Sequence, residues 1–198
     1  MLAATLLSLA PGPDNIFVLM QAALHGAHAG LLVTLGLCTG LIVHATLVAA
    51  GVAAIVLVND LAFTALKLAG AAYLVYLALG AWRAGASALP AAPVPVQSAL
   101  QLYRRGIVMN LTNPKVAIFF LAFLPQFARP EAGKVALQII VLSLIFIVIA
   151  LLVFGAVALL SSHLAVLFKR STAVQRLLNR AAALVFAGLA LHLALASR

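Results

Sequence analysis

Apolar runs separated by short polar segments dominate the pattern of hydrophobic and polar positions along this chain. Three of the runs contain no Lys, Arg, Asp or Glu, and three others contain one charged residue each, namely Asp14, Lys67 and Lys115. A helix needs about 20 predominantly apolar residues to cross a bilayer. The pattern therefore predicts an all-α integral membrane protein of about six transmembrane helices, at residues 1–24, 31–58, 61–82, 106–128, 135–162 and 181–197.

The amino-acid composition also favours a membrane location. Of the 198 residues, 66% are hydrophobic and 8% are charged, whereas average soluble domains carry roughly 25% charged residues. In a soluble protein, the net charge of +9 would suggest nucleic-acid binding. Here the basic residues concentrate in the short segments between the runs. We interpret them as signals of membrane orientation, and we expect the lipid bilayer, not nucleic acid, as a partner.

The distribution of lysine and arginine predicts the orientation. Cytoplasmic connections carry an excess of these residues, and the connections after the first, third and fifth runs hold most of them. This places both termini outside and the odd-numbered loops in the cytoplasm. The first run lacks a basic n-region and a clear cleavage site, so we expect residues 1–10 to form part of a span, not a signal peptide. The cytoplasmic set is Arg83, Arg104, Arg105, Lys169, Arg170, Arg176 and Arg180, against Arg129, Lys134, Arg198 and a snorkelling Lys67 outside.

A proline-rich segment divides the chain into two halves. Residues 86–98 contain three prolines among small residues, a composition that favours an extended linker. We expect a first three-helix repeat at 1–85, a cytoplasmic linker at 86–103 and a second repeat at 104–198. An odd number of spans in each half gives the halves opposite orientations, as in inverted-repeat transporters. The openings of the halves align weakly, and the alignment pairs Pro13 with Pro114 and Asp14 with Lys115.

Asp14 and Lys115 are the residues least expected in their surroundings. A charge at the centre of a spanning helix costs roughly 2.5 to 3.5 kcal/mol, and an interior proline costs about 3 kcal/mol. Pro13 and Pro114 add this second cost beside both charges. Because broken backbone at membrane depth is tolerated where it is buried in protein or lines a water-filled cavity, we expect both breaks to face one polar cavity that binds a zwitterion. Two alternatives are a static Asp14–Lys115 ion pair that joins the halves, and an Asp14 that lies at the membrane interface.

Several other polar or small residues belong to the predicted site or lie near it. Backbone groups freed by the prolines and the side-chain amides would hydrogen-bond either end of a substrate. Gly36, Gly40 and His44 fall on one helix face. The glycines favour close helix packing, and His44 is either a proton relay or a packing residue. His25 and His28 are interpreted as loop residues, and no metal site is predicted. The candidate substrate-binding residues are Pro11, Gly12, Pro13, Asp14, Asn15, His44, Asn110, Asn113, Pro114 and Lys115.

The chain offers little material for enzymatic chemistry. It has three acidic residues and no hydrolytic triad, glycine-rich phosphate loop or zinc motif. Cys38 is the single cysteine, which argues against a membrane oxidoreductase that passes electrons through paired thiols. We therefore expect no enzyme activity and no cofactor. Because the chain has no ATP-binding segment, the energy for any pumping would come from an ion gradient or from the gradient of the substrate.

Motifs in both halves resemble those of the lysine/homoserine/threonine exporter (LysE/RhtB) family of bacterial inner-membrane proteins. The resemblance covers essentially the whole chain. It implies a multi-pass protein of the bacterial inner membrane, built as two inverted three-helix repeats, that exports amino acids or related metabolites with the proton-motive force. It also implies a homodimer and a functional core around the two breaks. The motifs are residues 11–15, Gly40 with His44, residues 66–74, Arg105-Gly106, residues 110–115 and residues 123–127.

We therefore expect a secondary transporter that exports amino acids or related small zwitterions by alternating access. One alternative is a transporter of the same fold for a different solute, such as a cation or another metabolite. The other is a structural membrane subunit without transport activity. The second alternative predicts that Asp14→Asn and Lys115→Ala have no effect on transport.

Overall fold

The computed structural model describes residues 2–10, 12–52, 60–84, 97–161 and 172–195, and the regular structure in these ranges is helical. Four helices are each long and apolar enough to cross a bilayer. This agrees with the long apolar runs in the sequence, because only helices satisfy every backbone polar group within a single spanning segment. The four are α3 (Ala27–Leu47), α5 (Asp60–Arg83), α8 (Val135–Leu159) and α10 (Thr172–Leu195).

Two further spans are bent. In the first, α1 (Leu2–Leu9) and α2 (Pro13–His25) meet at 60°. In the second, α6 (Ala99–Leu111) meets the segment Pro114–Phe127 at 51°. That segment begins with α7 (Pro114–Ile118) and continues as a π-helical turn, η2 (Phe119–Phe123), and a 3₁₀ turn, η3 (Leu124–Phe127). If each bent pair is one span, the described residues contain six, and the prediction of an all-α, multi-span membrane protein is confirmed.

Two predicted boundaries differ from the structure. The helix α6 begins at Ala99, inside the predicted linker 86–103, because Ser98 and Gln101 form a capping box whose two bonds measure 2.8 and 3.3 Å. Most of that linker lies outside the described residues. The helix α10 begins at Thr172, nine residues before the predicted sixth span, so Arg176 and Arg180 lie on a helix and not in a loop. A window chosen for the absence of charge ends before charged residues that belong to the same helix.

The turn after α2 is also shorter than predicted. Gly26 alone separates α2 from α3 and has φ = +87°, a conformation that glycine adopts readily. His25 is the last residue of α2, and His28 lies in the first turn of α3. These two histidines are therefore on helix ends, and the prediction that they lie in a loop was wrong.

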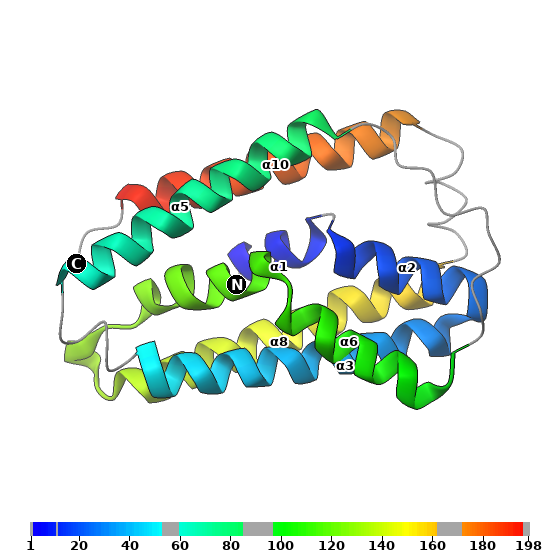
Figure 1. Cartoon of the computed structure of the whole chain (residues 1–198), viewed down its shortest axis with the longest axis horizontal. Helices are drawn as coiled ribbons and strands as arrows, with labels where there is room; N and C mark the ends of the chain where they lie inside the picture. The colour runs from blue at the N-terminus through cyan, green and yellow to red at the C-terminus, as the bar shows by residue number, and fades with distance from the viewer. Residues whose placement is uncertain (1, 11, 53–59, 85–96, 162–171, 196–198) are drawn as a thin grey trace.

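The helices form two groups (Figure 1). The helices α5 and α10 pack against each other along one side of the molecule. On the other side, α3 packs against α2, α6 and α8. The short α1 contacts both α8 and α10, and η2 and α7 contact α5. The two groups therefore meet around the broken segments of the bent spans.

The closest helix contact joins α3 and α6. A Cβ added at Gly36 would lie 2.1 Å from the carbonyl oxygen of Tyr103, and one at Gly106 would lie 2.4 Å from that of Val33. At Gly40, an added Cβ would lie 2.7 Å from the side chain of Asn110. The spacing of Gly36 and Gly40 predicts such a packing face, and the structure confirms it.

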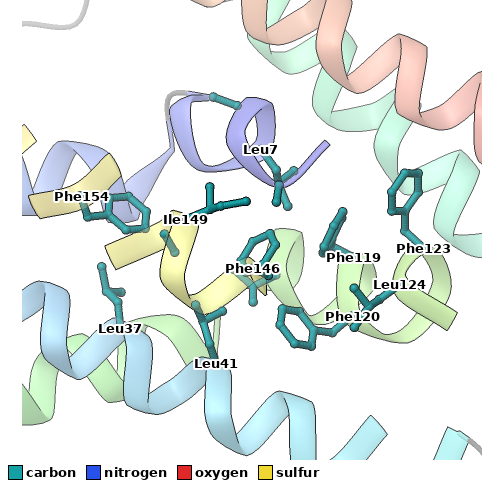
Figure 2. Close-up of a cluster of buried hydrophobic side chains, with 14 of the residues drawn as sticks. Leu7, Leu37, Leu41, Phe119, Phe120, Phe123, Leu124, Phe146, Ile149 and Phe154 are labelled. Atoms are coloured by element: carbon teal, nitrogen blue, oxygen red, sulfur yellow. The ribbon is translucent and has the colours of Figure 1, made fainter. Parts of the chain in front are cut away.

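Phenylalanine side chains fill the core where η2 meets α8 (Figure 2). The Phe119 ring lies 5.0 Å from both the Phe123 and the Phe146 ring centroids. Phe120 meets Phe146 edge to face at 5.4 Å, which is a favoured geometry for aromatic pairs. Leu7 of α1 is part of the same buried cluster. This cluster fixes the irregular half of the second bent span against α1 and α8.

Candidate functional site

The two helix breaks have the same local design. At the first break, Gly12 is the N-cap of α2 and Pro13 follows it. At the second, Asn113 is the N-cap of α7 and Pro114 follows it. Both N-caps have extended backbone, as expected because a following proline disfavours the helical conformation. Proline fits the first helical position since no hydrogen bond of its own amide is needed there. Each break therefore places a charged residue, Asp14 or Lys115, in the first turn of a new helix.

Asn113 connects the two charged residues. Its Nδ2 donates a hydrogen bond of 2.8 Å to Asp14 Oδ2, and its Oδ1 accepts one of 3.0 Å from the backbone amide of Lys115. Asp14 and Asn113 are 2% and 4% exposed, so this contact is closed to solvent. The first and second halves of the chain are thus joined at their breaks by a charge-assisted hydrogen bond.

The Lys115 side chain caps the C-terminal end of α1. Its Nζ donates to the carbonyl oxygens of Ala10 at 3.3 Å and Leu7 at 3.4 Å. Asn15 Nδ2 donates to the carbonyl oxygen of Ser8 at 2.7 Å. The last carbonyls of a helix have no partner within the helix, and a cation there also interacts favourably with the helix dipole. The lysine of the second break therefore stabilises the first break, and the predicted proximity of the two breaks is present.

A cavity of about 730 Å³ adjoins both breaks. Gly12, Pro13, Asn113, Pro114 and Lys115 form one wall, and residues of α5 and α10 form the opposite wall. The volume lies within the roughly 300–1,000 Å³ typical of small-molecule sites. A Cβ at Gly12 would lie 3.1 Å from Lys115 Nζ, so glycine at this position leaves room for the ammonium group.

The predicted site residues separate into three groups. Five of them line the cavity, as described above. Asp14 and Asn15 lie behind that wall, where they bind Asn113 and the end of α1. His44 and Asn110 lie elsewhere, between α3 and α6, where His44 Nε2 is 3.3 Å from the Asn110 carbonyl oxygen. Pro11 lies outside the described residues.

The packing around His44 agrees with the structural interpretation of that residue. Its ring centroid lies 5.8 Å from that of Phe120, and the side chain is 8% exposed. In the described part of the chain, no three His, Cys, Asp or Glu side chains gather where they could hold a metal ion.

One wall of the cavity was not predicted from the sequence. Tyr73, Tyr76, Gly80 and Arg83 of α5 line it. Of these four, only Arg83 had been named, and it had been interpreted as an orientation signal. These four recur at intervals of three, four and three residues, which places them on one helix face. A polar and aromatic stripe in the third run was the signal that could have identified this wall.

Exchanging the two side chains tests the hydrogen bond between Asn113 and Asp14. Asn113→Asp places two carboxyl groups at a 2.8 Å contact, and we expect a loss of stability on the order of 2 kcal/mol because a buried donor is lost. The double variant Asp14→Asn with Asn113→Asp restores one amide and one carboxylate, and the carboxylate introduced at position 113 retains an oxygen able to cap α7. We expect it to recover more than half of the lost stability, measured as melting temperature in detergent. A double variant that melts no higher than Asn113→Asp would contradict this bond.

Comparisons with known proteins identify relatives of the whole chain. Residues 5–197 match the family of LysE type translocators. The chain is 37% identical to a homoserine/homoserine lactone efflux protein of Salmonella typhimurium over 169 residues, which cover 85% of this chain and 82% of that protein. It is 30% identical to a leucine efflux protein of Klebsiella pneumoniae over 197 residues, which cover 96% of this chain and 91% of that protein.

A third relative is an uncharacterised membrane protein of Pseudomonas aeruginosa. It is 32% identical over 197 residues, which cover 96% of this chain and 90% of that protein. No solved structure matches the chain significantly. The family predicted from the motifs is confirmed by the match over residues 5–197. The chain therefore belongs to the LysE type translocator family, and it is a multi-pass protein of the bacterial inner membrane.

Proposed function

We propose that this protein exports amino acids or related small zwitterionic metabolites from the cytoplasm, and that the cavity between the helix breaks and α5 is the substrate site. The observation that carries the proposal is the position of Lys115, a lysine at a broken helix that lines a cavity of about 730 Å³. A cation and freed backbone groups are suited to bind a carboxylate. The names of two relatives, a homoserine/homoserine lactone efflux protein and a leucine efflux protein, support amino acids as the substrate class.

The extent of the cavity supports loading from the cytoplasm. Its wall on α5 runs from Tyr73 to Arg83 and continues to Ala84 just beyond the helix. The Ala84 carbonyl oxygen accepts a 3.3 Å hydrogen bond from Asn179 of α10. Arg83, Arg176 and Arg180 gather at this end of the α5–α10 pair. The excess of basic residues in cytoplasmic segments favours the cytoplasm for this end. The described conformation would then be the one that takes up substrate.

The arrangement of the helices in two groups supports alternating access. Movement of the α5–α10 pair against the group around α3 would close the arginine-rich end and open the opposite end. The pair contacts the rest of the molecule mainly through α1, α7 and η2. These segments lie beside the breaks, which makes them the candidate hinge. Motion of one helical group around a fixed midplane site is the usual scheme of secondary transporters. We propose the proton-motive force as the energy source.

Export from whole cells tests the function. Cells that overexpress the protein are loaded with a panel of dipeptides, and the release of each amino acid is compared with cells that carry an empty vector. We expect faster release of one or a few amino acids, and slower release when an uncoupler removes the proton gradient. Release equal to that of the empty vector across the panel, with the protein present in the membrane, would favour a different solute or a structural role.

A further inference from the structure

The described residues that line the cavity carry charge of one sign. Lys115 lies at the breaks and Arg83 lies near the end of α5, and the described lining contains no Asp or Glu. Asp14 is buried behind the wall, where its Oδ2 accepts from Asn113. The rest of the lining is mainly apolar or aromatic, with Ile16, Leu77 and Phe186 as examples. A ligand in this cavity therefore meets two cations, one at the breaks and one at the end of α5, in a lining that is otherwise mainly apolar or aromatic.

Lys115 has one donor left for a ligand. An ammonium group has three N–H donors, and in the described structure two of those of Lys115 point to the Leu7 and Ala10 carbonyl oxygens. Because the side chain also lines the cavity, the third donor is available for a carboxylate. This contact determines which end of an amino acid lies at the breaks.

Arg83 lies toward the end of α5 that points away from the second break. The helix α5 meets that break near Gly70, where an added Cβ would lie 3.5 Å from the Ile118 side chain of α7. Tyr73 and Arg83 are both in the lining, and ten residues of helix span about 15 Å. A substrate that enters from the arginine-rich end passes Arg83 before it reaches Lys115. A cleft lined by one sign of charge concentrates ligands of the opposite sign and repels those of the same sign.

The aromatic wall can receive one cationic group. The ring centroids of Tyr73 and Tyr76 lie 5.8 Å apart, and a ring face attracts an ammonium group held within about 6 Å of it. This contact suits the α-ammonium group of an amino acid whose carboxylate is on Lys115. The side chain of a lysine or arginine substrate carries a second cation. This cation would find no carboxylate partner in the described lining and would approach the like charge of Arg83.

We infer that Arg83 is a specificity-determining residue which, together with Lys115, restricts the cavity to amino acids with neutral side chains and excludes dibasic ones. This inference rests on the proposed function, because it assigns a substrate class to the same cavity. Lys115 binds the carboxylate that all amino acids share. Arg83 then discriminates between their side chains by charge.

Counterflow in proteoliposomes tests the inference. The purified protein is reconstituted, and uptake of radiolabelled leucine and homoserine is compared with uptake of labelled lysine and arginine. For the wild type we expect the neutral substrates to be favoured by roughly tenfold or more, and we expect Arg83→Glu to reduce that preference by roughly tenfold. Arg83→Gln, which removes the charge without reversing it, should give an intermediate preference.

Arg176→Glu is the matched control. It makes the same charge change at the same end of the molecule, on an exposed residue of α10 that is not part of the described cavity lining. We expect the preference of this variant for neutral over dibasic amino acids to stay within about twofold of the wild-type preference. Equal transport of neutral and dibasic amino acids by the wild type, or an unchanged preference in both Arg83 variants, would overturn the inference and leave the proposed function intact. A wild type that moves no amino acid would overturn both.

Discussion

Replacing Lys115 with alanine should reduce amino-acid release to the level of the empty vector. The substitution removes the positive charge at the inner end of the cavity. It also removes the donor that satisfies the Leu7 and Ala10 carbonyl oxygens at the end of α1. An unsatisfied buried polar group costs about 1–3 kcal/mol. We therefore expect a lower melting temperature in detergent as well as the loss of export.

Two further substitutions separate the structural effect from the loss of binding. Lys115→Met keeps the apolar stem without the charge, and Lys115→Arg keeps the charge but replaces the compact ammonium with a planar fork. We expect the Met variant to be inactive and the Arg variant to retain partial export. Lys134→Ala removes the same charge from an exposed residue before α8 and should export like the wild type. Release by Lys115→Ala above half the wild-type rate, at equal membrane expression, would contradict the proposed site.

Sequence reasoning was most successful where a local rule applied. Exposing a charge-free run of about 20 apolar residues to water is unfavourable, whereas placing it in lipid is favourable. The spans could therefore be predicted from the sequence. The breaks followed as well, because a proline beside a charge is doubly unfavourable inside a spanning helix. Asp14 and Lys115 are indeed beside the breaks, and both are buried, at 2% and 6% exposure.

The remaining features depend on contacts between distant segments. Nothing local indicates that Asn113 Nδ2 meets Asp14, 99 residues away, or that Lys115 reaches the end of α1. The asparagine had been assigned to the site for its amide, without its partner. Arg83 was already explained as an orientation signal, so a second role in the cavity wall was not considered. His44 became a candidate because an ionisable group in an apolar span suggested substrate contact. Its side chain lies between α3 and α6 beside Phe120 and is not part of the described cavity lining.

Substituting Gly36 with alanine should cause the largest loss of stability among small substitutions in this protein. The added Cβ would lie 2.1 Å from the Tyr103 carbonyl oxygen and 3.0 Å from the Gly106 Cα. Both neighbours are backbone atoms, so no side chain can rotate away and the helices α3 and α6 must separate. Overpacking typically costs 1–3 kcal/mol, and about 2 kcal/mol corresponds to a melting temperature roughly 4–8 °C lower for a chain of this size.

The control and a double variant make this prediction specific to the α3–α6 contact. A Cβ at Gly155 of α8 meets nothing within 4 Å, so Gly155→Ala should melt at or slightly above the wild-type temperature, since alanine favours helix. Gly106→Ala acts on the same contact, where its Cβ would lie 2.4 Å from the Val33 carbonyl oxygen. Once one substitution has separated the helices, the second meets less resistance, so the double variant should lose less stability than the sum of the single losses. Two outcomes would mean that the backbones of α3 and α6 do not approach so closely. One is a double variant whose loss of stability equals the sum of the single losses, and the other is a Gly36→Ala variant with the same melting temperature as Gly155→Ala.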